Sequence, residues 1–217
     1  MDVILSGVVG STAHGLAGPQ SDLDRAGVFL IPTRHLLGFD RPAETVVTTD
    51  PDASFHELEK FLRLALKANP SVLELLWLPE HDARTPLGDE LVGLRDSLLS
   101  ERAVRAAFLG YADAQQLKLL HRQQGDAGPM TGRALKHARH ILRLLEQGRE
   151  LLAGTMSVAV RNPAFYRDVL PTLSFAQFEA LRDEARRAFE ATPSALPEHP
   201  DSAGVEAWLI GVRLRSL

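Results

Sequence analysis

The sequence of 217 residues contains no cysteine. This absence excludes disulfide bonds, zinc sites with thiolate ligands and catalysis by a thiol, and it agrees with a reducing compartment. Long apolar runs are also missing, since no stretch approaches the ~20 residues that a transmembrane helix needs. The N-terminal segment lacks the basic start and the cleavage site of a signal peptide. We therefore expect a cytoplasmic protein that has no membrane partner.

Neither sign of charge dominates the chain. Lysine and arginine total 24, aspartate and glutamate total 28, and the formal net charge is −4. This balance excludes a general nucleic-acid binder, although a local basic patch can still bind RNA. Hydrophobic residues make up 45% of the sequence, which is enough to build the core of one sizeable domain or two small ones.

Two kinds of periodicity divide the chain and predict an α+β fold. Strand-like runs lie within the first 58 residues, at 2–9, 24–31, 45–49 and 52–56. Beyond them apolar residues recur at helical spacing. The expected helices run from about 57 to Asn69 and over 72–77 (with Ser71 as its cap), 87–99, 102–124, 131–153, 174–191 and 204–216. We expect a catalytic module at 1–100 and a helical module at 101–217 packed on it.

The stretch from Val8 to Val28 combines residue types that bind phosphate and metal. Gly10 allows backbone to approach a ligand closely, and Ser11 offers a hydroxyl group and an N–H at the start of a helical turn. Two acids then open the second apolar run, Asp22 and Asp24. In a strand, side chains two residues apart point the same way. Both carboxylates are therefore expected on one face, with Leu23 entering the core.

Two adjacent carboxylates repel each other unless a cation lies between them. Mg²⁺ is commonly held by one or two carboxylates together with substrate phosphate oxygens. The pair Asp22 and Asp24 therefore predicts a site for Mg²⁺ (or Mn²⁺) beside a phosphate cradle at Gly10 and Ser11. The alternative is a solvated surface turn with an ordinary serine cap. His14, one turn later, either approaches the phosphates or faces water.

Two-metal phosphoryl chemistry also needs a further acid close to the attacking hydroxyl group. Asp50, Asp52 and Glu57 are the candidates in this sequence. Asp52 fits best because it opens a short extended segment just before a helix. Glu57 lies at the start of that helix, where an acid is favourable simply as a partner of the helix dipole.

A second group of candidate residues lies in the helix expected at 131–153. Lys136, His140 and Arg143 are spaced i, i+4 and i+7, so they share one helix face. A face that carries lysine, histidine and arginine can close over a triphosphate. These three residues are therefore candidate nucleotide contacts, and the alternative is an ordinary polar helix surface.

The motif at 10–24 resembles the signature of DNA polymerase β superfamily nucleotidyltransferases, which is Gly-Ser on a helical turn followed about ten residues later by Asp-x-Asp on a strand. Longer stretches, at 10–16, 21–28 and 60–77, are similar to the RlaP branch, whose members are predicted nucleotidyltransferases linked by name to RNA repair. The resemblance covers roughly residues 1–160.

This resemblance implies a small mixed β-sheet core and a metal-dependent transfer of a nucleoside monophosphate. The donor would be a nucleoside triphosphate such as ATP, bound with Gly10 and Ser11, and Asp22, Asp24 and Asp52 would be the metal ligands and catalytic acids; the resemblance also points to Asp52 as the third acid. The acceptor hydroxyl could belong to an RNA end, a protein (AMPylation) or a small molecule. The rival interpretations are an inactive nucleotide-binding or antitoxin-like partner on the same fold, and a helical interaction protein with a coincidental motif.

Overall fold

The computed structural model of the chain describes residues 2–19, 21–39, 42–50, 52–122, 129–130 and 132–217. The chain forms two compact units, one made of residues 1–100 and 198–217 and the other of residues 101–197. None of the helices in the described ranges combines the length and the apolar character needed to cross a membrane.

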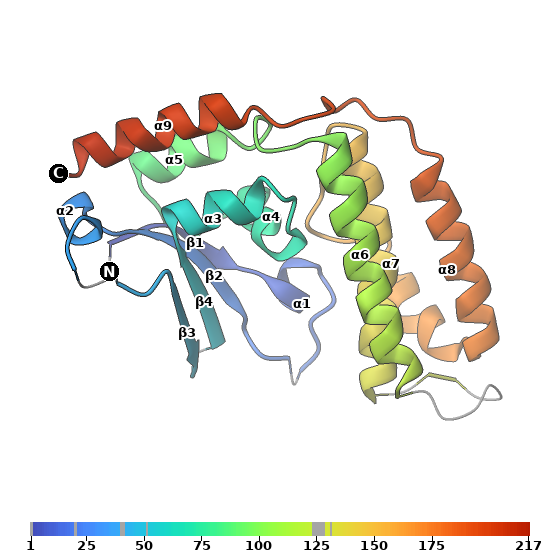
Figure 1. Ribbon diagram of the computed structural model, residues 1–217. Coiled ribbons are helices and arrows are strands. Elements are labelled where there is room, and N and C mark those ends of the chain that lie inside the picture. Colours follow the sequence, from blue (N-terminus) through green and yellow to red (C-terminus); the bar gives the residue numbers. More distant parts are fainter. Residues whose placement is uncertain (1, 20, 40–41, 51, 123–128, 131) are drawn as a thin grey trace. The chain divides into compact units, whose positions relative to one another are not determined.

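A five-stranded mixed sheet is the framework of the first unit (Figure 1). Its spatial order is β3-β4-β2-β1-β5; β2 and β4 are parallel, and the other neighbours are antiparallel. The strands are β1 (Asp2–Val8), β2 (Arg25–Leu30), β3 (Thr45–Thr49), β4 (Asp52–Glu57) and β5 (Ala83–Arg84). The predicted α+β fold is thus confirmed.

The parallel pairing of β2 with β4 brings the starts of these two strands together. Arg25 of β2 is the register partner of Ala53 of β4. The residues that precede this pair, Asp24 and Asp52, therefore lie at the same level of neighbouring strands. The intervening chain returns through the short helix α2 (Thr33–Leu36) and through β3, which pairs with the other side of β4.

Besides α2, the helices of the first unit in the described ranges are α1 (Gly10–Ala13), α3 (Leu58–Ala65), α4 (Pro70–Leu76), α5 (Pro86–Gly93) and α9 (Ser202–Arg215). Three of them, α3, α4 and α5, pack against strands of the sheet. The side chain of Asn69 accepts hydrogen bonds from the backbone N–H groups of Ser71 and Val72, and Pro70 takes the first helical position of α4. The expectation that Ser71 caps this helix is therefore wrong, because a proline that lacks an N–H suits the first turn and moves the cap to the residue before it.

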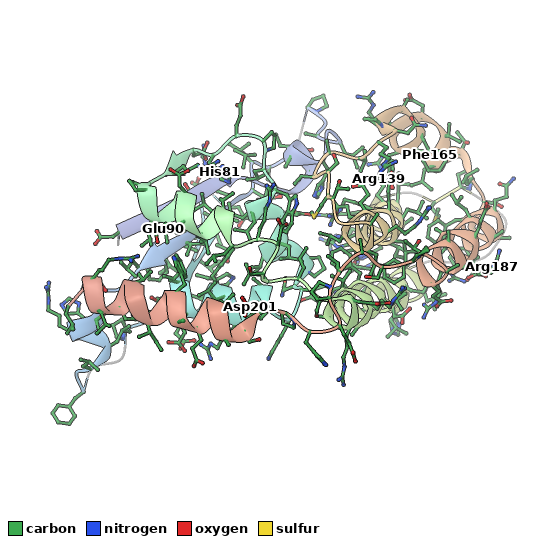
Figure 2. All side chains as sticks on the ribbon, turned by 90° about the horizontal axis from the view of Figure 1, so that it is seen from above. His81, Glu90, Arg139, Phe165, Arg187 and Asp201 are labelled. Carbon is green, nitrogen blue, oxygen red and sulfur yellow. The ribbon has the colours of Figure 1, made fainter. Side chains whose placement is uncertain are left out.

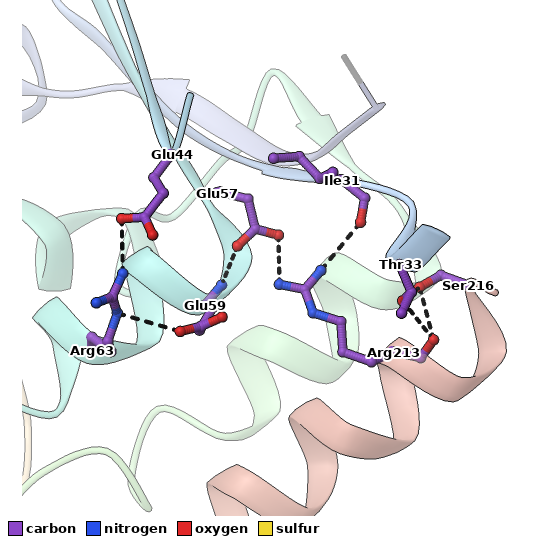
Figure 3. A network of polar contacts seen from close by, with 8 residues as sticks. All are labelled: Ile31, Thr33, Glu44, Glu57, Glu59, Arg63, Arg213 and Ser216. Atoms are coloured by element: carbon purple, nitrogen blue, oxygen red, sulfur yellow. Dashed lines mark hydrogen bonds and ion pairs between the residues drawn. The ribbon is translucent and has the colours of Figure 1, made fainter. Parts of the chain in front are cut away.

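A buried ion pair joins α9 to the sheet (Figure 3). Arg213 of α9 donates to Oε1 of Glu57 at 2.7 Å and to the carbonyl oxygen of Ile31 at 3.2 Å. The other carboxylate oxygen of Glu57 accepts from the backbone N–H of Glu59 at 2.8 Å and so caps α3. The last helix thus returns to the first unit, a connection that the residue pattern alone did not predict.

Two further polar contacts fix α9 in place. Trp208 Nε1 and Arg215 Nη2 both donate to Oε2 of Glu90 on α5, at 2.8 and 3.0 Å. Asp201 caps α9 by accepting from the N–H of Gly204 at 2.9 Å. Glu90 and Asp201 are labelled in Figure 2. The second half of α9 is therefore held by side chains of α5 and β4.

Three long helices build most of the second unit. They are α6 (Glu101–Leu120), α7 (Gly132–Leu152) and α8 (Phe175–Glu190), with shorter helical turns at Phe165–Val169 and Leu170–Thr172. Gly148 of α7 is the point of closest packing, because a Cβ atom there would lie 2.5 Å from the ring of Phe189 and 3.1 Å from Phe108. The absence of a side chain at position 148 lets α6 and α8 both pack tightly against α7.

We expect Arg213→Met to destabilise the first unit strongly. Methionine fills a similar volume but leaves the buried Glu57 carboxylate without its partner, which typically costs about 3–5 kcal/mol. Urea denaturation measures this loss in the free energy of unfolding. The control is Arg215→Met, which removes an exposed ion pair and should cost at most about 1 kcal/mol. Equal losses in the two variants would contradict a structural role for the Glu57–Arg213 pair.

Candidate active site

The turn after β1 lies directly against the segment that leads into β2. Gly10 has a φ of +68°, in the left-handed region that favours glycine. The N–H of Val9 donates to the carbonyl oxygen of Asp24 at 2.9 Å. A Cβ atom on Gly10 would overlap Oδ2 of Asp24 and would lie 3.1 Å from its Cγ. The Asp24 carboxylate therefore rests on the bare backbone of Gly10.

Ser11 belongs to the short helical turn that begins at Gly10. Two backbone hydrogen bonds close this turn, α1. The N–H of His14 donates to the carbonyl oxygen of Gly10 at 3.0 Å, and the N–H of Leu16 donates to the carbonyl oxygen of Ser11 at 2.9 Å. The Ser11 side chain is half-buried, and within the described ranges it makes no hydrogen bond. The predicted glycine-serine turn is therefore present beside Asp24.

The two acids of the motif differ in their surroundings. Asp22, Leu23 and Asp24 form an irregular connection, and β2 begins only at Arg25. Asp22 is exposed, whereas Asp24 is half-buried. The expectation that Leu23 enters the core is wrong, because its side chain is 43% exposed. The physical reason is that β1 ends at Val8, opposite Arg25, so residue 23 lies beyond the paired ladder.

The three candidates for the third carboxylate occupy distinct environments. Glu57 is buried and forms an ion pair with Arg213, so its carboxylate has a structural role. Asp50 lies in the exposed turn between β3 and β4. Asp52 is the exposed first residue of β4, at the level of Asp24, the residue that directly precedes β2. Of the three, Asp52 has the sheet position that adjoins the motif.

The residues at this edge of the sheet fit a hard divalent cation by their chemistry. In the described part of the chain, no three histidine, aspartate or glutamate side chains converge closely enough to hold a metal ion by themselves. Mg²⁺, however, usually takes one or two carboxylates from a protein and completes its shell with water and substrate phosphates. The half-buried carboxylate of Asp24, beside the turn at Gly10 and Ser11, is suited to such a shared site.

His14 connects the turn to the helix α4. Its side chain is 7% exposed, and its Nε2 lies 2.7 Å from Oε1 of the buried Glu74. Of the two alternatives for His14, the structure therefore excludes the one in which it faces water. Glu74 was missed in the sequence, although it is the single acid in the otherwise apolar run from Val72 to Trp77. The pair ties the end of the turn to the body of the first unit.

The three candidate nucleotide contacts on α7 belong to the second unit. Lys136 is exposed and His140 half-buried, whereas Arg143 is only 6% exposed. Arg143 donates to Oε1 of Gln147 at 2.6 Å and to Nε2 of His140 at 3.4 Å. Arg143 is too deeply buried to belong to an ordinary polar helix surface, which is the alternative interpretation of these residues. That these residues contact a nucleotide stays a prediction.

The sequence of residues 1–184 matches the family described as RlaP, RNA repair pathway DNA polymerase beta family. The chain belongs to the RlaP family. The match extends beyond the stretch on which the resemblance rests, and it includes the turn at Gly10, both motif acids and Asp52. No curated protein matches the sequence. Membership in the RlaP family indicates a nucleotidyltransferase, which is the reaction class that the motif predicts.

We expect Gly10→Ala to disturb this site more than Gly15→Ala does. Both glycines have a positive φ, +68° and +70°, so alanine strains the backbone by a similar ~1–2 kcal/mol at each. Only at Gly10 does the new methyl group displace Asp24, since no atom lies within 4 Å of a Cβ on Gly15. The free energy of unfolding should therefore fall by a further ~1–3 kcal/mol in Gly10→Ala. Equal losses in urea denaturation would show that Asp24 does not depend on the bare backbone.

Proposed function

We propose that this RlaP-family protein transfers a nucleoside monophosphate from a nucleoside triphosphate to a hydroxyl acceptor and releases pyrophosphate. One observation carries the proposal: the Asp24 carboxylate rests on Gly10, directly beside Ser11. A carboxylate and a turn with free polar groups thus lie side by side, as binding of a metal-complexed triphosphate requires. The position of Asp52 at the level of Asp24 supports the proposal.

Each residue of the site has a distinct role in the proposed reaction. Gly10 leaves room for the Asp24 carboxylate beside the turn, and the Ser11 hydroxyl group donates to the β- and γ-phosphates. Asp22, Asp24 and Asp52 would hold Mg²⁺ or Mn²⁺, which when bound neutralises charge on the phosphate oxygens. The His14–Glu74 pair positions the turn from beneath.

The chemical step is an in-line displacement at the α-phosphorus. The oxygen atom of the acceptor hydroxyl attacks this phosphorus, and its proton passes to the Asp52 carboxylate. The bond from the α-phosphorus to the bridging oxygen breaks, and pyrophosphate leaves with the electron pair. The protein contributes mainly by positioning the two reactants and by stabilising the charge that develops.

An RNA end is the acceptor that the family description supports, since it names an RNA repair pathway. The test is incubation of the protein with each of the four α-labelled nucleoside triphosphates, with and without RNA. Label on RNA supports an RNA acceptor, and label on a protein indicates AMPylation. If no acceptor is labelled although the triphosphate raises protein stability by ~2.7 kcal/mol at ~100 times its Kd, the protein is a nucleotide-binding partner.

We expect Asp24→Asn and Asp22→Asn each to reduce transfer of the α-phosphate at least ~100-fold. Loss of a carboxylate ligand removes several kcal/mol of charge stabilisation, and each ~1.4 kcal/mol is a factor of ten in rate. Both variants should stay folded, because asparagine is isosteric and neither side chain is fully buried. Undiminished transfer by folded protein in both variants would overturn the proposed site.

The third acid is tested by the neighbouring pair Asp52→Asn and Asp50→Asn. Both aspartates are exposed and lie at the same hairpin, so each substitution removes one charge from almost the same place. We expect Asp52→Asn to lower the rate of transfer at least ~10-fold, as loss of a general base does, and Asp50→Asn to leave it unchanged. The opposite result would assign the third carboxylate to Asp50.

A further inference from the structure

Charge is strongly segregated at one end of the α6–α7 helix pair. The chain as a whole has more acids than bases, with a net charge of −4. Yet residues 114–122 and 132–145 contain no aspartate or glutamate. The lysines and arginines of these two segments are Lys118, Arg122, Arg133, Lys136, Arg139 and Arg143. Such a local excess of positive charge contrasts with the balance of the rest of the chain.

The packing of the two helices gathers four of these cations around one point. The hydrogen bond between His137 Nδ1 and Gln115 Oε1, at 2.7 Å, sets the level at which α7 crosses α6. Lys118 and Arg122 follow Gln115 by three and seven residues, which places them along one side of α6 and the turn after it. Arg133 precedes His137 by one helical turn, and Lys136 is its neighbour. We call Lys118, Arg122, Arg133 and Lys136 the basic patch.

The residues of the basic patch are exposed and form no ion pairs with other described residues. All four side chains are exposed. Among the residues that the structure describes, none of the four forms an ion pair. Other arginines of the same unit do: Arg105 with Glu101, Arg182 with Asp183 and Arg186 with Asp113. Within the described ranges, the basic patch therefore presents four exposed positive charges that have no ion-pair partner.

The electrostatic effect of the patch reaches His137 at its centre. Burial and the four surrounding cations, Arg122, Lys118, Lys136 and Arg133, all lower the pKa of His137 from its ordinary value. His137 and its hydrogen bond to Gln115 thus lie amid the four cations of the basic patch.

We propose that the basic patch binds the phosphate backbone of an RNA strand. Four exposed cations on two neighbouring helices form a surface that can contact several successive phosphates, which a single small anion could not. RNA is the polyanion that the family description names. The choice of RNA as the partner rests on the proposed function. The basic patch adds a binding surface that shares only Lys136 with the candidate nucleotide contacts.

Binding is measured without any nucleoside triphosphate, by fluorescence anisotropy of a labelled single-stranded RNA of mixed sequence. The test variant is Lys118→Gln/Arg133→Gln; Lys136 stays unchanged because it is a candidate nucleotide contact. The control is Arg149→Gln/Arg187→Gln, which removes two exposed arginines from α7 and α8 of the same unit (Arg187 is labelled in Figure 2). Unfolding temperatures establish that both variants are folded.

The test variant should bind the RNA at least ~10-fold more weakly than the unaltered protein. The slope of log K against log salt concentration should become shallower by about 1.4, since each phosphate contact to a single strand contributes roughly 0.7. The control should match the unaltered protein in both quantities. Absence of RNA binding in the unaltered protein, or an equal loss in the control, would overturn the proposal.

Two further measurements separate this proposal from others. Leu117 and Leu120 are exposed near Lys118, so vesicles that contain anionic lipid provide a second arm of the test. Binding to vesicles with little or no binding to RNA would overturn the proposal. Asp24→Asn should bind RNA as the unaltered protein does. If the unaltered protein binds RNA but shows no transfer, the basic patch is supported and the proposed function is overturned. If the unaltered protein shows transfer but does not bind RNA, the basic patch is overturned and the proposed function is supported.

Discussion

The carboxylate of Asp24 occupies the space that a side chain at position 10 would fill. This single contact determines how the end of β1 meets the start of β2, and it explains why glycine stands where the backbone turns into the left-handed region. The hydrogen bond from Val9 to the Asp24 carbonyl oxygen holds the same two segments together. The candidate site is thus a product of the sheet itself, built where two paired strands begin and end.

Acidic residues of the first unit include two groups, buried glutamates that stabilise the fold and aspartates near the surface that are candidate ligands. Glu57 and Glu74 are buried and each has a close basic or imidazole partner, Arg213 and His14. Asp22 and Asp52 are exposed, and Asp24 is half-buried against glycine. A buried carboxylate needs a partner inside the protein because its desolvation is costly. Acids near the surface retain access to solvent and to ligands, which is the condition for binding a metal-complexed nucleotide.

Much of this architecture could be predicted from the sequence because it depends on local patterns. The runs 45–49 and 52–56 became strands, and the periodic segments after residue 57 became helices. Gly10 and Asp24 also met as their motif predicts. The failures concern long-range placement: Leu23 lies beyond a ladder whose end the sequence does not mark, and the bond of His14 to Glu74 joins residues on separate elements. The return of α9 to the first unit likewise depends on the ion pair between Arg213 and Glu57, which no local sequence pattern indicates.

The return of α9 has a consequence for the order in which the chain folds during synthesis. Strands β1 to β5 all leave the ribosome before residue 101, yet the charge of Glu57 remains uncompensated until Arg213 has been made. The helical unit is translated in between, and the backbone N–H of Glu101 donates to the carbonyl oxygen of Pro197 at 2.8 Å, which brings its two ends together. The contacts of α9 with the sheet therefore cannot form until the whole helical unit has been synthesised, because Arg213 follows that unit in the chain.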